Sequence, residues 1–123
     1  MKLRIRGDSI RLRLTQTEVA RLAEEGRVEE STHFGPDERF TYAIAFGAES
    51  TLSARLSPRG IEVTVPGEVA RAWAASDSVG IEGARELGDG KTLRILVEKD
   101  FACLTKRPHE DDADAFPNPN TSC

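Results

Sequence analysis

The chain has 123 residues, of which 31% are charged and 38% hydrophobic, a composition typical of a soluble globular domain. The formal net charge is −4, and all of it belongs to residues 108–123, which hold four acidic residues and no Lys or Arg. The neutral remainder argues against a nucleic-acid partner, which requires a basic surplus. The chain also contains no apolar run long enough to span a membrane.

Residues 1–14 predict a β-hairpin. Apolar and charged residues alternate in Leu3–Arg6 and in Ile10–Leu14, and residues 7–9 between them, Gly-Asp-Ser, have turn composition. One face of the hairpin should carry the inward residues Leu3, Ile5, Ile10, Leu12 and Leu14. Because charged residues interrupt the first positions, the segment does not resemble a secretion signal, and we expect a cytoplasmic protein.

A helix should follow this hairpin. Thr15 can cap it, Glu18 completes a capping box, and Gly26 supplies the left-handed stop. Its buried stripe should consist of Val19, Leu22 and Ala23. The next strands are Val28–Phe34, a polar strand suited to a sheet edge, and Phe40–Phe46, whose large apolar residues suit a central strand.

The second half predicts the same order of elements. Strands at Leu52–Leu56 and Ile61–Val65 lead through Pro66 into a helix with Val69, Ala72 and Trp73 inward. A last hairpin, Val79–Leu87 and Thr92–Glu98, surrounds Gly88-Asp89-Gly90.

An internal repeat ties the two halves together. The tetrapeptide Glu-Val-Ala-Arg occurs at Glu18–Arg21 and again at Glu68–Arg71, with one residue fewer between strand and helix in the second copy. The order ββαββ thus occurs twice, at about 1–47 and 50–99. We predict an α+β fold with antiparallel sheets in a barrel-like or sandwich arrangement and two short helices. Residues 1–107 should form one domain and 108–123 an extended acidic tail.

Residues with metal-binding side chains gather near the C-terminal end: Cys103, His109, Asp111, Asp112, Asp114 and Cys123. Thiolate, imidazole and carboxylate groups together could hold Zn²⁺ or Fe²⁺. The spacing matches no zinc-finger pattern, however, and a solvated acidic tail with one buried cysteine accounts for the same residues.

The arginines Arg4, Arg6, Arg11 and Arg13 should project together from the polar face of the first hairpin. Four guanidinium groups could bind a phosphate, a carboxylate ligand or RNA. The alternative is cross-strand pairing with Glu29, Glu62, Glu82 or Glu98, which the neutral charge of the body favours.

Three segments, Met1–Thr15, Val97–Leu104 and Glu110–Pro119, resemble a family of small single-domain bacterial proteins of unknown function. The resemblance spans the chain and implies a bacterial origin but no activity. It also implies that the acidic tail belongs to the domain.

The sequence contains none of the familiar catalytic or nucleotide-binding motifs. We therefore expect a non-enzymatic binding module, with a metal or ligand site in the C-terminal segment. One alternative is a protein-interaction module that uses the acidic tail. Another is a small enzyme whose anionic ligand lies in a cleft lined by the arginines of the first hairpin.

Overall fold

The structure, a computed structural model, describes residues 1–101, 114 and 116. Its elements in chain order are β1 (Lys2–Arg6), β2 (Ser9–Leu14), α1 (Gln16–Glu25), β3 (Arg27–His33), β4 (Arg39–Gly47), β5 (Ser53–Ser57), β6 (Gly60–Pro66), α2 (Gly67–Ala74), β7 (Gly80–Gly88) and β8 (Lys91–Lys99). The predicted ββαββ order, occurring twice, is confirmed.

The strands form two four-stranded sheets, with the orders β1-β2-β8-β7 (sheet A) and β3-β4-β6-β5 (sheet B). Each sheet therefore takes one hairpin from each half of the chain. The predicted α+β sandwich is confirmed, whereas within residues 1–101 the sheets do not close into a barrel. The sheets are also not purely antiparallel, because the two hairpins of each sheet join through a parallel pair, β2 with β8 and β4 with β6.

Exchanging the two halves of the chain converts one sheet into the other. The exchange takes β1, β2, β7 and β8 to β5, β6, β3 and β4, so the order of sheet A becomes the order of sheet B. The registers agree as well, since Leu12 pairs with Val97 in sheet A and Val63 pairs with Ile44 in sheet B. The sandwich thus has pseudo-twofold symmetry.

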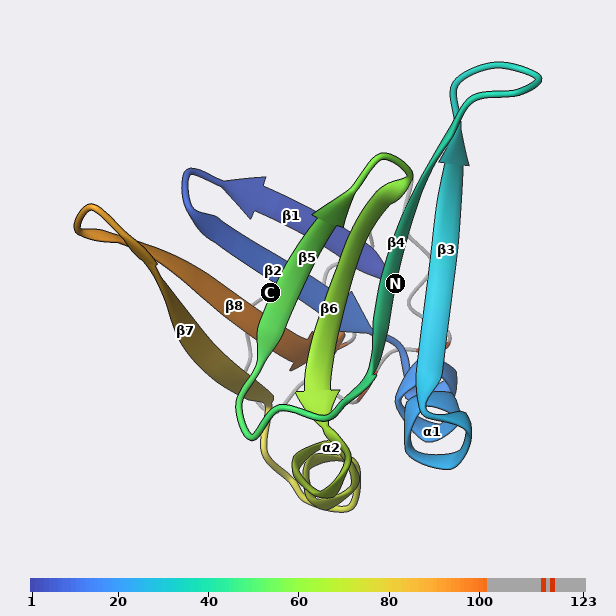
Figure 1. The fold of residues 1–123 in the computed structure, drawn as a ribbon. Coiled ribbons are helices and arrows are strands. Elements are labelled where there is room, and N and C mark those ends of the chain that lie inside the picture. The colour runs from blue at the N-terminus through green and yellow to red at the C-terminus, as the bar shows by residue number, and fades with distance from the viewer. Residues whose placement is uncertain (102–113, 115, 117–123) are drawn as a thin grey trace.

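The core lies between the inner faces of the sheets and is closed at one end by the helices (Figure 1). Its largest fully buried side chains are Leu12, Leu14, Leu22, Ile44, Val63, Val65, Ile95 and Val97. α1 packs against α2 where β2 and β6 finish, and the sheets diverge toward the other end. Ile5 was expected to be in the core but is 56% exposed: it lies near the end of the edge strand β1, whereas its cross-strand partner Ile10 on β2 is buried.

The predicted signals of the first helix are confirmed. The Glu18 backbone nitrogen donates to Thr15 Oγ1 (3.3 Å), and the Thr15 nitrogen donates to Glu18 Oε1 (3.0 Å), which completes the capping box. Gly26 ends the helix with φ = 76°, and its nitrogen donates to the Leu22 carbonyl oxygen. A side chain at this position would be strained, and its Cβ would lie 3.1 Å from the Phe46 ring.

The second helix buries Trp73 as predicted, but the rest of its buried face differs from the prediction. Ala70 and Trp73 are buried, whereas Val69 is 38% exposed and Ala72 is exposed. The reason is that Glu-Val-Ala-Arg begins at the third residue of α1 but at the second residue of α2, and a shift of one residue turns a side chain by about 100° around the helix axis. Ala70 and Trp73 consequently occupy the positions that Val19 and Leu22 occupy in α1.

Candidate anion-binding site

The outer face of sheet A carries a row of arginines. The register of β1 and β2 sets Arg4 directly opposite Arg11, and Arg6 opposite Ser9. The parallel pairing of β2 with β8 then sets Arg94 beside Ser9. Directly paired residues share one face of a sheet, so these side chains all lie opposite the core. We call Arg4, Arg6, Arg11 and Arg94 the arginine face.

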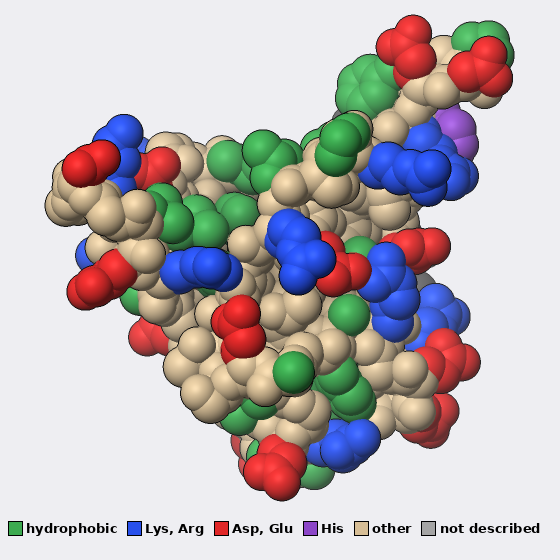
Figure 2. Space-filling view, in the orientation of Figure 1, with side chains coloured by type: hydrophobic (Ala, Val, Ile, Leu, Met, Phe, Trp, Pro, Cys, Tyr) green, Lys and Arg blue, Asp and Glu red, His purple; other side chains and the backbone are tan. Residues whose placement is uncertain are grey.

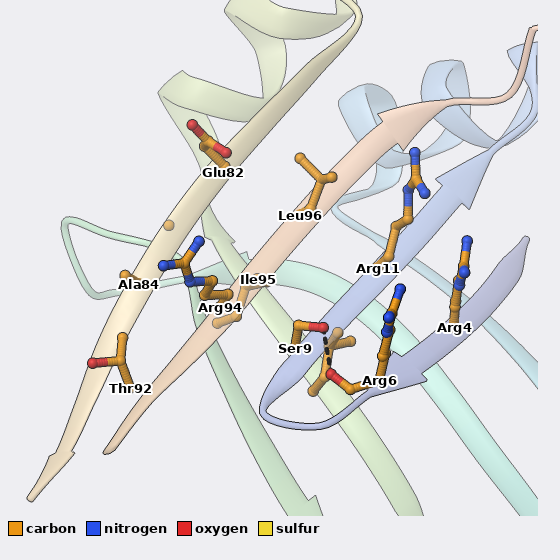
Figure 3. Close-up of a pocket in the computed structure, with 12 residues that line it drawn as sticks. Arg4, Arg6, Ser9, Arg11, Glu82, Ala84, Thr92, Arg94, Ile95 and Leu96 are labelled. Carbon is orange, nitrogen blue, oxygen red and sulfur yellow. Dashed lines mark hydrogen bonds between the residues drawn. The ribbon is translucent and has the colours of Figure 1, made fainter. Parts of the chain in front are cut away.

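This surface is hollowed by a shallow cavity of about 680 Å³. Its lining includes the four arginines, the hydroxyl residues Ser9 and Thr92, the carboxylate Glu82 and the apolar Leu96. Figure 3 shows Arg4, Arg6 and Arg11 on the first hairpin and Arg94 on β8, all projecting from the same side of the sheet. The cavity therefore offers several hydrogen-bond donors around a partly apolar floor.

Only part of the positive charge is neutralised. Arg11 forms an ion pair with Glu98, and Arg13 lies 3.7 Å from the same carboxylate. Arg4, Arg6 and Arg94 form no ion pair with any residue that the structure describes. The cross-strand pairing expected from the sequence is thus right for Glu98. It is wrong for Glu29 and Glu62, which lie on sheet B and pair with Arg27.

Two arginines oppose each other directly across the hairpin: Arg4, which has no ion pair among the described residues, and Arg11, which also contacts Glu98. Like charges that face each other directly across an antiparallel pair repel and lower stability. Arg4 faces Arg11, and the single carboxylate in the cavity, Glu82, lies two strands farther on, on β7. Guanidinium groups donate in a planar fork that matches phosphate and carboxylate oxygens. An anion in the cavity would therefore relieve repulsion and gain directed hydrogen bonds.

Three of the four arginines predicted as ligand-binding, Arg4, Arg6 and Arg11, line the cavity. Arg13 lies on the same face beside Glu98 but outside the lining. Arg94 was missed, although its outward position in the alternating segment Thr92–Glu98 could have marked it as a surface arginine. Its place beside Ser9 depends on the parallel pairing, which sequence patterns did not indicate.

The cavity contains few ionisable side chains. Its titratable lining residues are the four arginines and Glu82. Arginine stays protonated in proteins, so it cannot exchange protons near neutral pH. His33 lies elsewhere, on the exposed edge strand β3 opposite Arg39.

Most of the predicted metal ligands, Cys103, His109, Asp111, Asp112 and Cys123, lie outside the described residues. Asp114 is described, and its carbonyl oxygen accepts a hydrogen bond from the Gln16 nitrogen (2.8 Å). Its Oδ1 accepts from the Thr17 nitrogen (3.2 Å). Hydrogen bonds from Thr15 and Thr17 hold the pKa of Asp114 below its ordinary value. This carboxylate thus lies at the start of α1, and the described residues contain no cluster of three metal-binding side chains.

Phe116 also lies against the body of the domain. Its nitrogen donates to the Asp100 carbonyl oxygen, and its ring packs edge-on against Phe101 with the centroids 5.6 Å apart. The buried Lys99 ammonium lies 5.2 Å from the Phe116 ring and 5.6 Å from the Trp73 ring, and donates to the Ser76 carbonyl oxygen. The Phe116 ring thus packs within the chain, and a partner for the acidic tail stays a prediction.

Three groups with shifted pKa values lie together at a different place, around the N-terminal ammonium of Met1. It lies 2.7 Å from Glu18 Oε2 and 2.6 Å from Glu30 Oε1, while the Tyr42 hydroxyl donates to Glu30 (3.0 Å). Burial and then the bond to Glu30 raise the pKa of Tyr42 to about 12. Shifted groups often mark functional sites. Here every charge has a partner, so the cluster joins β1, α1 and β3 structurally.

The chain as a whole matches a known family. The sequence profile of DUF7009, a family of unknown function, matches residues 1–120. The chain belongs to DUF7009. No curated protein and no solved structure matches it. Membership in DUF7009 confirms the resemblance to a small domain of unknown function, while the bacterial origin stays a prediction. Neither helix in the described part of this DUF7009 domain is long and apolar enough to cross a membrane.

Proposed function

We propose that this domain is a non-enzymatic binding module that holds a small oxyanion with two or more negative charges on the arginine face. The observation that carries the proposal is the direct opposition of Arg4 and Arg11 beside an unpaired Arg94. Keeping like charges together costs stability in the free protein, and a bound anion offsets that cost.

The lining favours phosphate-bearing small molecules. Phosphate oxygens accept hydrogen bonds from guanidinium forks and from hydroxyls such as those of Ser9 and Thr92. Leu96 adds an apolar surface against which an organic group could pack. A cavity of about 680 Å³ falls within the range of small-molecule sites. As expected from the sequence, we propose a cytoplasmic location. We likewise expect no nucleic-acid partner and no membrane partner.

The test compares binding of inorganic pyrophosphate and a panel of phosphorylated metabolites to the wild type and to the double variant Arg4→Gln/Arg94→Gln. Glutamine keeps most of the side-chain length and removes the charge. A ligand present at 100 times its Kd should stabilise the wild type by about 2.7 kcal/mol in thermal unfolding. The variant should bind at least about tenfold more weakly.

The matched control is Arg21→Gln, which removes an exposed arginine from α1, away from sheet A. Its binding should equal that of the wild type. Raising the salt concentration should weaken wild-type binding, because exposed charges are screened. A flat response of the wild type to the whole panel would refute the proposal, as would equal binding by the double variant.

A further inference from the structure

The pseudo-twofold symmetry brings together a second set of arginines on sheet B. In sheet A, one row across the strands reads Arg4, Arg11, Leu96 and Glu82. The equivalent row in sheet B reads Arg55, Glu62, Ala43 and Glu29. Lys and Arg side chains gather over this outer face of sheet B with carboxylates between them (Figure 2).

The two carboxylates of this second face share one cation, which offsets part of their charge. Arg27 donates to both Glu62 and Glu29, and the Glu29 contact is 3.0 Å long. These two hydrogen bonds, led by the one from Glu62, raise the pKa of Arg27 above its ordinary value. One cation therefore holds both anions of the row and leaves the remaining arginines of the face without a carboxylate partner.

Those remaining arginines are Arg39, Arg55 and Arg59, which form no ion pair with any residue in the described part of the chain. Together with Thr41 and Ser57 they line a hollow of about 380 Å³. Ala43 lies where sheet A has Leu96, so the floor offers less apolar surface. The hollow is thus smaller and more polar than the one on sheet A, which suits a compact inorganic anion.

We propose that this surface (Arg39, Arg55 and Arg59) is a second oxyanion site, so that one domain binds two anions on opposite faces of the sandwich. The inference rests on the proposed function of sheet A for its ligand class. The two sites differ in selectivity: sheet A accepts anions with an organic group, and sheet B accepts compact phosphates. A single small ligand cannot span both faces, because the full thickness of the sandwich separates them.

Isothermal titration calorimetry with inorganic pyrophosphate tests the inference. The wild type should bind two equivalents, and the variants Arg4→Gln/Arg94→Gln and Arg39→Gln/Arg55→Gln should each bind one. Arg21→Gln, as the control, should bind two. Thermal unfolding without ligand checks that each variant is folded; all the substituted arginines of the two faces lack ion pairs among the described residues, so no internal contact is lost.

A third variant, Arg27→Gln, tests whether the contacts of Arg27 with Glu29 and Glu62 are needed for anion binding at sheet B. Arg27 lines the hollow as well, and its removal also frees Glu29 and Glu62 to repel an anion at sheet B, so affinity there should fall at least about tenfold. If the wild type binds one equivalent and Arg4→Gln/Arg94→Gln abolishes it, the second site does not exist while the function of sheet A stands. If the wild type binds one equivalent and only Arg39→Gln/Arg55→Gln abolishes it, the anion site proposed for sheet A does not exist. No binding at all would overturn both.

Discussion

The backbone nitrogen of Met1 lies 2.7 Å from Glu18 Oε2, and both groups are almost completely buried. Removing the Glu18 carboxylate leaves the Met1 ammonium with Glu30 alone, whose side chain is 43% exposed, and also breaks the capping box of α1. We expect Glu18→Gln to lower the free energy of unfolding by about 3 kcal/mol, measured by urea denaturation of protein that begins at Met1. Glu25→Gln is the control, because its carboxylate is exposed on the same helix. A loss below about 1 kcal/mol in Glu18→Gln would contradict the structural role.

The same cluster should shape the pH dependence of stability. For the Met1 ammonium, burial lowers the pKa, but hydrogen bonds to Glu18 and Glu30 outweigh it and raise the pKa above 8.0. For Glu30, burial raises the pKa, but hydrogen bonds from Met1 and Tyr42 bring it below 4.5. The charged Met1 ammonium contributes its full stabilisation at pH values below its pKa in the unfolded state. That stabilisation is lost as the pH rises through its pKa in the folded state. The Glu30 carboxylate contributes its full stabilisation at pH values above its pKa in the unfolded state. That stabilisation is lost as the pH falls through its lower pKa in the folded state.

We therefore expect the free energy of unfolding to be highest between about pH 4.5 and pH 8 and to decline on both sides. Urea denaturation at a series of pH values measures this profile. Glu30→Gln removes the group that titrates on the acid side, so its profile should decline less there than that of the wild type. Superimposable acid limbs for the two proteins would show that Glu30 does not contribute.

Gly60 begins β6 opposite Thr41, where the backbones approach closely. Its φ is 150°, and a Cβ atom there would lie 1.7 Å from the Thr41 carbonyl oxygen. Gly60→Ala should therefore destabilise the domain by more than about 3 kcal/mol in thermal unfolding. Gly7→Ala is the matched control: Gly7 also has a positive φ (53°) but no atom within 4 Å, so only about 1 kcal/mol of backbone strain is expected. Equal losses would show that strain alone, without the clash, decides.

Phe116 should stabilise the domain through its contacts with Phe101 and Lys99. Because its side chain is partly buried against the core, Phe116→Ala should lower the free energy of unfolding by about 2 kcal/mol. Phe34→Ala removes the same side chain from a position that is 72% exposed, and should change stability by less than about 0.5 kcal/mol. If the two variants unfold alike, the Phe116 contacts add nothing to stability.

The arginine face should lower the stability of the free protein and favour the binding of anions. In phosphate-free buffer, Arg4→Gln should raise the free energy of unfolding by about 0.5 kcal/mol, because it removes the repulsion with Arg11. The same substitution should weaken pyrophosphate binding. Arg21→Gln loses no such repulsion and should gain no stability. A destabilised Arg4→Gln protein would mean that Arg4 has a structural partner instead.

Local signals predicted the elements well because the interactions that form them are local. Thr15, Glu18 and Gly26 act within a few residues of one another, so their pattern marks α1 without any knowledge of the rest of the chain. Alternation similarly places Arg4, Arg6 and Arg11 on one face of a hairpin. What alternation cannot show is the partner of the hairpin, and Arg94 joins the arginine face only through the pairing of β2 with β8.

The exposure of Ile5 has a similar origin. The alternation places Ile5 on the same face as the buried Leu12, but only the fold shows that Ile5 lies on an edge strand of sheet A. The Met1 cluster likewise required the fold, because Glu18 and Glu30 meet the first residue from different elements.

The repeated Glu-Val-Ala-Arg illustrates the division between the two kinds of information. By itself the sequence determined that the chain is a duplication and that each half has the order ββαββ. The tertiary structure decided which residues correspond. The identical letters are out of phase by one position, and Val19 is matched by Ala70 rather than by Val69. The physical reason is that successive side chains of a helix point about 100° apart, so a motif that begins one residue earlier in α2 than in α1 is turned away from the core.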